Sequence, residues 1–360
     1  MAGKPGGDRT VSDRRMTFAS RIAAWQRRHG RHGLPWQGVR DPYRIWLSEI
    51  MLQQTQVATV IPYYERFLVR FPDVAALAAA PDDEVMRLWS GLGYYARARN
   101  LLRAARIVVS EHGGRFPRSL TEVAALPGIG PSTAAAIVAF ATGEPHAILD
   151  GNVKRVMARH FGIAGAADSP ATLAQLWATA RSVLPEKGIE AYTQGLMDLG
   201  ATVCVRSGPA CGRCPVSGTC VALREDRVAE LPGRKARRAA PVKETAMLVL
   251  LSQGEVLLQK RPPRGIWGGL WSLPEAPTDA DPGAWARRSL GLRVRNVEAL
   301  EPFTHAFTHF RLAVRPWLLQ AARARNRGGR PEFTWLDLRD AQDAALPAPV
   351  KKLLARVARA

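Results

Sequence analysis

The sequence predicts two parts of different fold class, a mainly α-helical part followed by a smaller domain of mixed α and β structure. From residue 16 to 223, apolar residues recur at spacings of three and four, interrupted by Pro and Gly, which is typical of packed helices. Residues 245–262, TAMLVLLSQGEVLLQKRP, predict two strands around a glycine-containing turn, and residues 303–319 predict further strand. The polar, basic residues 224–243 between the two parts indicate a linker, which leaves residues 244–360 as the second domain.

The chain carries a large excess of positive charge. Its 51 Lys and Arg against 31 Asp and Glu give a net charge of +20. Such an excess indicates a polyanionic partner, with nucleic acid favoured and a basic membrane-surface protein as the alternative. No apolar run approaches the ~18 to 20 residues of a membrane span. Residues 1–15 lack the apolar core of a secretory signal, so we expect a mobile basic tail and a cytoplasmic protein.

Local signals place several helix starts. Asp41 and Pro42 form a cap and first-turn proline, and Ser119 with Glu122 forms a capping box. The sequence LPGIGPSTA, residues 126–134, predicts a Gly-x-Gly turn leading into an Ala-rich helix. Backbone amides left unpaired there can hold a phosphate, so we expect a helix-hairpin-helix that binds the DNA backbone. The alternative is an ordinary helical hairpin with a glycine cap.

Two carboxylates are candidates for acid–base chemistry. Glu49 shares a helix face with Ile45 and Trp46, and desolvation there would keep it protonated as a general acid. Asp150 precedes a helix that starts near Val153, whose first amides favour the ionised form. A neutral acid beside a fixed anion is an arrangement that cleaves glycosidic bonds. The alternatives are a glutamate on a solvated helix edge and an aspartate that only caps a helix.

The four cysteines form a compact group in the sequence. They follow the spacing C-x6-C-x2-C-x5-C, which is typical of metal binding rather than of scattered disulfides. Zinc and an iron–sulfur cluster both accept four thiolates, so the spacing leaves both open. The ligands in either case would be Cys204, Cys211, Cys214 and Cys220.

These pieces together resemble the MutY-type adenine DNA glycosylases. The resemblance rests on LPWQGVRDPYRIWLSEIMLQQTQVATVIPYYERF, GLGYYARARNL, LPGIGPSTA, ILDGNVKRV and the cysteine spacing, and it extends over about residues 20 to 355. It implies a helix-hairpin-helix glycosylase domain with a [4Fe–4S] cluster, which resolves the choice of metal, and a Nudix-like α+β C-terminal domain. The implied function is base excision repair by removal of adenine mispaired with 8-oxoguanine or guanine.

The resemblance also implies roles for individual residues. Glu49 matches the general acid that protonates adenine at N7, and Asp150 matches the aspartate that stabilises the oxocarbenium-like state. Asn152 matches a residue that organises this site, and Gln194 lies where the family contacts the extruded adenine, which must leave the base stack to be reached. The expected DNA contacts are Leu52, Gln53, Gln54, Tyr94, Gly128, Gly130, Ser132 and Lys154.

Ser132 bears on whether the protein cuts the strand. Relatives of the endonuclease III type carry a lysine at this position, whose amine attacks the sugar and forms a Schiff base. A serine hydroxyl without a base is a poor substitute, so we predict base removal by water and an abasic product. Strand cleavage should be absent or weak, with occasional Schiff-base trapping through Lys154.

The second domain resembles a Nudix fold that has lost its metal chemistry. RPPRGIWGGLWSLPEAP, residues 261–277, resembles the start of that fold, but DPGAWARRSLGL, residues 281–292, lacks the carboxylates that hold magnesium in Nudix hydrolases. FTHF matches the family's loop over 8-oxoguanine, so Phe307, Thr308 and His309 are its expected readers. Thr308 stands where the family usually has serine; it keeps the hydroxyl and adds a methyl group. The alternative for this loop is ordinary strand packing.

Three rival functions remain: a glycosylase for damaged pyrimidines, a nucleotide-pool hydrolase tethered to DNA, and a non-catalytic cluster-bearing DNA-binding or redox-sensing protein. Ser132 and the second domain argue against the first, the missing metal carboxylates against the second, and the two carboxylates against the third. We therefore expect a monomeric, nucleoid-associated enzyme whose partner is double-stranded DNA containing A:8-oxoguanine or A:G mispairs, with no membrane association.

Overall fold

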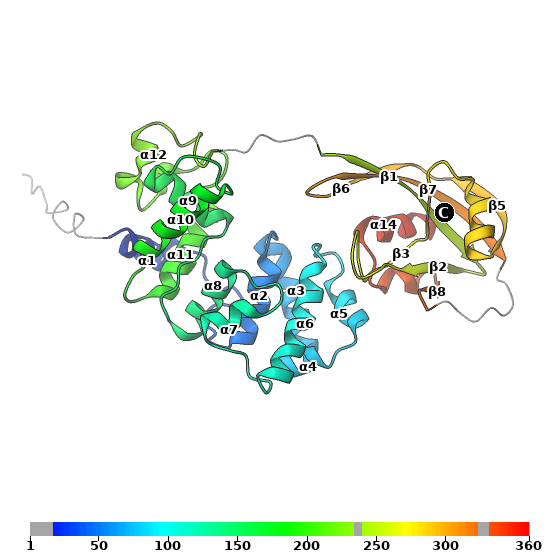
Figure 1. The fold of residues 1–360 in the computed structure, drawn as a ribbon, viewed down its shortest axis with the longest axis horizontal. Coiled ribbons are helices and arrows are strands. Elements are labelled where there is room, and N and C mark those ends of the chain that lie inside the picture. Colours follow the sequence, from blue (N-terminus) through cyan, green and yellow to red (C-terminus); the bar gives the residue numbers. More distant parts are fainter. Residues whose placement is uncertain (1–16, 234–239, 323–330, 360) are drawn as a thin grey trace, which may run out of the picture. The chain divides into compact units, whose positions relative to one another are not determined.

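The computed structural model describes residues 17–233, 240–322 and 331–359 (Figure 1). The chain divides into two compact units. The first contains residues 17–75 and 104–233, and the second joins residues 76–103 to the described residues from 240 onward. The expected tail, residues 1–15, and residues 234–239 of the expected linker lie outside the described residues.

The first unit is built from helices, as the apolar spacing predicts. None of the helices among the described residues is long and apolar enough to cross a membrane. The helices up to the cysteine loop, of which α5 and the first half of α6 belong to the second unit, are α1 (Phe18–His29), α2 (Pro42–Leu52), α3 (Val57–Arg70), α4 (Val74–Ala78), α5 (Asp82–Trp89), α6 (Ala96–Glu111), α7 (Leu120–Ala125), α8 (Pro131–Thr142), α9 (Gly151–Phe161), α10 (Pro170–Ser182) and α11 (Ile189–Thr202). The cysteine loop itself contains η2 (Cys211–Arg213), η3 (Ser217–Thr219) and α12 (Val221–Arg224).

The predicted helix starts are confirmed. Asp41 caps α2 by accepting a hydrogen bond from the amide of Tyr43 at 2.9 Å, with Pro42 in the first turn. Ser119 caps α7 by accepting from the amide of Glu122, and the two side chains also hydrogen-bond to each other. Each cap satisfies backbone donors that have no partner inside the helix.

Close helix packing brings α9 and α11 together with α1. A side chain at Gly195 of α11 would place its Cβ 2.8 Å from Ile22 of α1, and one at Gly200 would lie 2.6 Å from the Cβ of Asn152 on α9. These glycines let the helices approach closely, and Ile22, Val153 and Leu199 fill one buried cluster between them. The first turn of α9, with Asp150 before it, is thereby held against α11.

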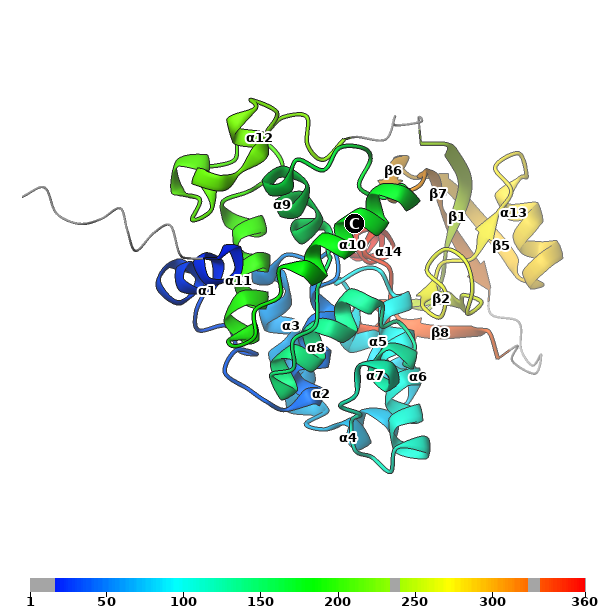
Figure 2. The ribbon, with the colours of Figure 1, turned by 60° about the vertical axis from the view of Figure 1, so that its left-hand side comes forward.

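The second unit contains α5, the first half of α6 and the strands. Figure 2 labels α5, α6 and most of the strands. Within the described residues the strands form one eight-stranded sheet in the order β3-β2-β1-β7-β5, with β4 on β1, β6 on β7 and β8 on β2. Only the β1–β7 pair of this sheet is parallel. The strands are β1 (Val242–Ser252), β2 (Glu255–Lys260), β3 (Trp271–Ser272), β4 (Glu275–Ala276), β5 (Arg293–Ala299), β6 (Phe303–Ala306), β7 (Arg311–Ala322) and β8 (Phe333–Asp337). The helical segments that accompany them are α13 (Pro282–Trp285), η4 (Ala286–Leu290), η5 (Asp340–Asp343) and α14 (Ala348–Val357).

Both strand predictions are confirmed. The β1–β2 pair is antiparallel with Gly254 at its turn, as residues 245–262 predict. Residues 303–319 supply further strand as predicted, as β6 and most of β7, and the chain turns between the two, where the amide of Phe307 donates to the carbonyl of Phe310 at 2.9 Å. The FTHF sequence is therefore the tip of an antiparallel hairpin.

Residues 76–103 pack with the sheet part of the second unit. The Ser90 hydroxyl donates to the carbonyl of Leu346 at 2.9 Å, and the Lys260 ammonium pairs with Asp83. The Arg99 guanidinium donates to the carbonyl of Gly268. This grouping of a helical segment with the distant C-terminal residues is not predictable from the linear pattern.

Candidate active site

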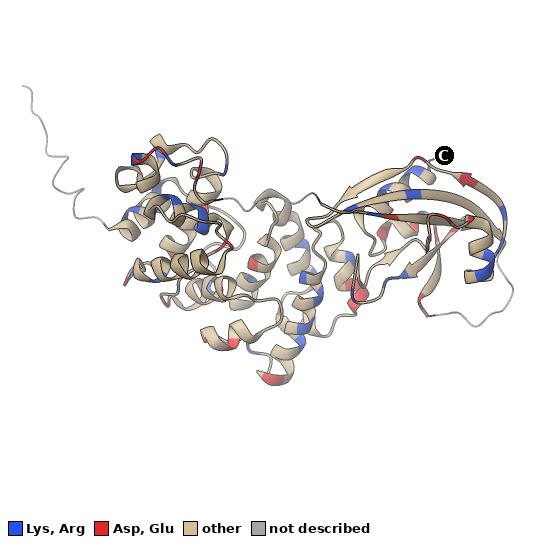
Figure 3. Ribbon diagram, turned by 45° about the horizontal axis from the view of Figure 1, so that its top comes forward, with Lys and Arg blue, Asp and Glu red and all other residues tan. Residues whose placement is uncertain are grey.

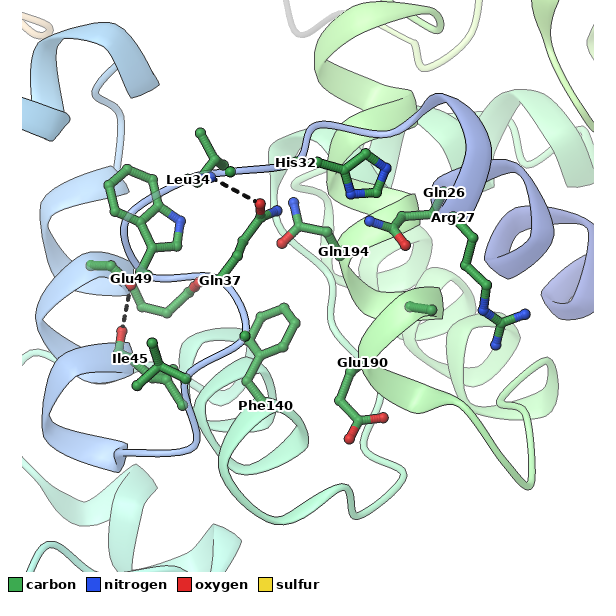
Figure 4. A pocket seen from close by; sticks show the side chains of 16 residues that line it. Gln26, Arg27, His32, Leu34, Gln37, Ile45, Glu49, Phe140, Glu190 and Gln194 are labelled. Atoms are coloured by element: carbon green, nitrogen blue, oxygen red, sulfur yellow. Dashed lines mark hydrogen bonds between the residues drawn. The ribbon is translucent and has the colours of Figure 1, made fainter.

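A cavity of about 490 Å³ opens among the residues before α2, α2 itself, α8 and α11 (Figure 4). Glu49 projects into it from α2, and Gln194 approaches from α11 on the other side. Trp36, Gln37 and Phe140 complete the wall between them. The cavity thus combines apolar surface with several polar and charged side chains, so it offers both stacking surface and hydrogen-bonding groups to a small ligand.

Glu49 is held in its neutral form by its surroundings. Burial and, to a smaller extent, the nearby negative charge of Asp150 together raise the pKa of its carboxyl from the usual 4.5 to about 8. Among the described residues the carboxyl has no hydrogen-bond partner, so nothing in the protein competes for its proton. A protonated glutamate facing the cavity can act as a general acid at neutral pH.

Asp150 caps α9 and lies close enough to influence Glu49. One of its carboxylate oxygens accepts hydrogen bonds from the amides of Asn152 at 2.8 Å and Val153 at 2.7 Å. As the sequence predicts, these amides favour the ionised form and lower the pKa of Asp150. Burial raises the pKa of Asp150 by more than the two amides, Arg155 and Lys154 together lower it. The helix start therefore offsets a desolvation cost rather than producing a strongly acidic group.

Asn152 is fixed by a residue that the sequence reasoning missed. The Arg155 guanidinium donates to the Asn152 side-chain oxygen at 2.8 Å and to the carbonyl of Gly200 at 2.6 Å. The same guanidinium donates to the carbonyl of Cys204 at 2.7 Å. Arg155 lies three residues after Asn152 on α9, which is the only sequence signal for this contact. It connects the first turn of α9 to the start of the cysteine loop.

The glycine turn before α8 has the expected backbone. Gly128 has φ +82°, and Gly130 occupies the N-cap position of α8 without a side chain that could cap it. The Ser132 hydroxyl accepts a hydrogen bond from the amide of Leu149 at 2.9 Å. Ser132 therefore has a structural partner immediately before Asp150. Gln53 donates weakly to the Gly128 carbonyl at 3.5 Å, which anchors the end of α2 on this turn.

Two expected DNA contacts occupy strained backbone. Gln54 has φ +57° and Tyr94 has φ +47°, a left-handed conformation that non-glycine residues rarely adopt. Both side chains are exposed, whereas Leu52 at the end of α2 is half-buried. The Lys154 ammonium is paired with Asp168 at 2.6 Å. Gln54, Leu52 and Lys154 belong to the first unit and Tyr94 to the second.

The hairpin tip between β6 and β7 is lined with aromatic rings. Phe307 stacks on Phe310 with ring centroids 4.4 Å apart, and Trp267 lies 5.7 Å from Phe307. Thr308 and His309 are exposed, and the Thr308 hydroxyl is 3.3 Å from that of Tyr94 within the second unit. The structure therefore brings Tyr94 together with the expected reading loop.

The four cysteines lie close together as free thiols. Burial raises the pKa of Cys214 most, and the neighbouring sulfurs of Cys204, Cys220 and Cys211 add to the shift, which brings the pKa to about 11. Among the described residues, no group of three or more His, Cys, Asp or Glu side chains has the arrangement of a site for a metal ion. The Arg159 guanidinium donates to the Cys204 sulfur at 3.4 Å, a contact that suits a thiolate. By residue type, four thiols are nevertheless a donor set that a metal cofactor accepts.

Basic side chains are spread over both units. Figure 3 shows Lys and Arg on the helices and on the sheet part, with fewer Asp and Glu among them. The surface is consistent with the net charge of +20.

Comparisons with known proteins identify the family. The description "HhH-GPD superfamily base excision DNA repair protein" matches residues 47–181, and "NUDIX domain" matches residues 245–356. The adenine DNA glycosylase of Buchnera aphidicola subsp. Baizongia pistaciae is 35% identical over 343 residues, which cover 95% of this chain and 97% of that protein. This chain belongs to the adenine DNA glycosylase family. The human member is 30% identical, with 93% of this chain and 73% of the human protein covered.

A solved structure agrees with the helical part of this glycosylase family member. A thermostable thymine-DNA glycosylase is 31% identical with a TM-score of 0.54, over 61% of this chain and 100% of that protein. The predicted MutY-type resemblance and the helix-hairpin-helix and Nudix-like folds are therefore confirmed.

Proposed function

We propose that this protein removes adenine that is mispaired with 8-oxoguanine, and less specifically with guanine, from duplex DNA in base excision repair. The observation that carries the proposal is the environment of Glu49. Its carboxyl faces a cavity of about 490 Å³, and burial and the charge of Asp150 raise its pKa to about 8. The relatives named above are adenine DNA glycosylases. A cavity of this volume holds one extruded base.

The proposed chemistry uses the two carboxyls in different roles. Glu49 donates its proton to N7 of the extruded adenine, and the bond between N9 and the sugar C1′ breaks with its electron pair leaving on the base. Asp150 stabilises the positive charge that develops at C1′, and Asn152 keeps the first turn of α9 in place. Water then adds to C1′ and loses a proton, which leaves an abasic site.

We propose that strand cleavage does not follow. Ser132 carries no amine, and its hydroxyl is engaged by the amide of Leu149. The nearest amine in the sequence to Asp150 is that of Lys154, which is paired with Asp168. An ammonium in an ion pair is a poor nucleophile, so Schiff-base trapping through Lys154 should be rare.

The remaining assignments follow the same family resemblance. Cys204, Cys211, Cys214 and Cys220 would hold a [4Fe–4S] cluster, which when bound cross-links the loop after α11. Purified protein should then contain equal amounts of iron and inorganic sulfide, and zinc in place of iron would contradict this assignment. Gly128, Gly130 and Gln53 would contact the DNA backbone, and Gln54 and Tyr94, with Leu52 beside them, would enter the base stack near the lesion.

We propose that residues 16–223 perform the chemistry and residues 244–360 read the base opposite the adenine, with residues 224–243 as the linker. Phe307, Thr308 and His309 at the hairpin tip would contact 8-oxoguanine. The protein would act as a monomer at the nucleoid in the cytoplasm. Nudix-type hydrolysis is disfavoured because residues 281–292 contain a single carboxylate, Asp281.

The test is a panel of labelled duplexes incubated with the protein and then split into samples with and without hot alkali. We expect strand scission at adenine opposite 8-oxoguanine only after alkali, slower reaction at A:G, and none at A:T. Scission without alkali would contradict the absence of lyase activity. Reaction at T:G or at damaged pyrimidines instead of adenine would overturn the substrate.

A further inference from the structure

Four arginines lie close together at one edge of the sheet and take no part in the proposed chemistry. They are Arg287 and Arg288 on η4 and Arg293 and Arg295 on β5, the strand at one end of the sheet order. All four are exposed, and we call this surface the arginine edge. A Cβ at Gly283 would lie 3.3 Å from Val297 of β5 and 4.0 Å from the Arg287 Nη1, so the Arg287 guanidinium lies beside the strand.

The arginine edge has no anion of its own. Among the described residues, none of its four guanidinium groups forms an ion pair or a side-chain hydrogen bond. Of the nearby carboxylates, Asp281 accepts from the Ala284 amide at 2.6 Å and caps α13, which leaves Glu298 of β5. The sequence of residues 323–330, which lie outside the described part of the chain, contains no Asp or Glu. Such a group of arginines suits phosphates, because a guanidinium can donate two parallel hydrogen bonds to one anion.

The arginine edge and the hairpin tip lie at opposite ends of β7 (Figure 1). Arg311 at the tip pairs with Ala306 of β6, whereas Ala322 at the other end pairs with Arg293 of β5. The strand is continuous between them, since residues 311–320 pair in register with β1. At ~3.3 Å per residue, β7 spans about 36 Å from tip to edge. One turn of B-DNA advances by about 34 to 36 Å, so both surfaces can contact the same side of one duplex.

The geometry of β5 favours DNA over an acidic peptide that would add to the sheet as a further strand. The register of β5 against β7 shifts between Val294 and Val297. Such a bulge twists the strand and interrupts the regular row of backbone groups that an added strand needs. DNA needs no such row, because side-chain charge is enough to bind its phosphates.

We propose that the arginine edge binds the phosphate backbone of the duplex about one helical turn away from the base that the hairpin tip contacts. The inference rests on the proposed function, which assigns the contact with 8-oxoguanine to the tip. It adds a second DNA-binding surface to the C-terminal residues, which holds the duplex outside the lesion and reads no sequence. The surface contributes only when the DNA extends far enough to reach it.

The experiment measures binding to duplexes that differ only in the length of DNA beside the lesion. Each carries a tetrahydrofuran abasic analogue opposite 8-oxoguanine, so that no base can be released. The flanks are about 6 or about 18 base pairs on both sides, which is shorter or longer than one turn. Fluorescence anisotropy gives the affinity between about 50 and 200 mM salt for the full-length wild type and two double variants. These are Arg293→Gln with Arg295→Gln, and Arg287→Gln with Arg288→Gln.

Arg224→Gln with Arg356→Gln is the matched control. It also removes two exposed positive charges, but these arginines already pair with Glu225 at 3.5 Å and with Glu301 at 3.0 Å. The rate of adenine release at saturating enzyme should equal that of wild type in every variant, which verifies that each protein is folded.

On the long duplex, each double variant of the arginine edge should lower the slope of log affinity against log salt concentration by about 2, because each phosphate contact contributes about 0.9 to it. On the short duplex the same variants should keep the wild-type slope. The control should keep the wild-type slope on both duplexes.

Three results would overturn the proposal. An unchanged slope on the long duplex would leave the arginines the role of keeping the sheet edge from pairing with other chains, or an acidic protein as their partner. Equal decreases on the short and long duplexes would contradict the spacing of one turn. An equal decrease in the control would attribute the effect to net charge alone. Failure of the proposed function is distinguishable, because wild type would then bind this lesion no more tightly than an undamaged duplex of the same length.

Discussion

At the scale of single residues, the site depends on two carboxyls whose pKa values both lie above the usual range. Burial is the largest cause for each, and the charge of Asp150 adds to the shift of Glu49. The difference between them comes from the first amides of α9, which hydrogen-bond Asp150 and lower its pKa, whereas Glu49 has no such partner among the described residues. We therefore assign the proton donor to Glu49 and the anion to Asp150 in the proposed chemistry.

The pH dependence of the chemical step follows from these shifts. Glu49 acts in its protonated form, so the single-turnover rate on A:8-oxoguanine should fall as the pH rises through about 8. Asp150 acts in its ionised form, so the rate should fall on the acidic side at a pH above the ordinary range of an aspartate. The profile is measured from pH 4 to 10 by quenched-flow assay.

Two variants serve as controls for this profile. Glu49→Gln should lower the rate by about 10²- to 10⁴-fold and remove the alkaline limb. The residual activity of Asp150→Asn should show an alkaline limb at lower pH, because the charge that raises the pKa of Glu49 is gone. A rate that does not decline up to pH 10 would contradict the role of Glu49.

Ser132 is expected to matter for stability. Ser132→Ala leaves the buried amide of Leu149 without its acceptor, which costs about 1 to 3 kcal/mol of unfolding free energy. Urea denaturation measures the loss, and Ser182→Ala, at an exposed hydroxyl on α10, should change stability by less than about 0.5 kcal/mol. Equal stability of the two variants would refute the structural role.

At the scale of elements, α9 is positioned by its close approach to α11. Gly200→Ala would force a Cβ to 2.6 Å from that of Asn152, so α9 must move. We expect a loss of about 1 to 3 kcal/mol in unfolding free energy, with a lower rate of adenine release. Gly151→Ala, at the start of α9, adds its Cβ to open space and should leave the unfolding free energy unchanged or slightly higher. A Gly200→Ala protein with wild-type stability and rate would contradict this account of α9.

The elements that the sequence predicts well are those with local causes. The caps of Asp41, Ser119 and Asp150 involve amides two or three residues away, so the sequence alone indicates them. The turn at Phe307 has no local cause in the sequence, because FTHF contains no Gly or Pro, and only the family resemblance indicated a loop there. The pKa direction of Asp150 also had to come from the structure, since burial depends on α11 and other distant residues.

At the scale of the whole molecule, the net charge indicates DNA as the partner but does not indicate how the segments of the chain group into units. A net charge of +20 predicts DNA binding through phosphate contacts, and the chain belongs to a DNA glycosylase family. The grouping of residues 76–103 with the C-terminal residues depends on contacts such as Ser90 with Leu346, which lie 256 positions apart. No local pattern encodes such a contact.

The charge makes a prediction for DNA binding. Affinity for an undamaged duplex, measured by fluorescence anisotropy, should fall at least about a hundredfold between 50 and 200 mM salt, because bound cations are released from the phosphates. The Glu49→Gln variant should give the same slope of log affinity against log salt concentration, since its substitution lies in the cavity and removes no positive charge. A salt-independent affinity would indicate that phosphate contacts do not dominate binding.

The most direct measurement of the central claim is the stoichiometry of the products. A duplex with adenine opposite 8-oxoguanine is incubated with excess wild-type protein at pH 7, and free adenine and intact strand are quantified in the same sample. The account predicts one free adenine for each intact abasic strand, and release about 10²- to 10⁴-fold slower with Glu49→Gln. Adenine retained on the DNA, or adenine released at an equal rate by Glu49→Gln, would contradict hydrolysis initiated by this carboxyl.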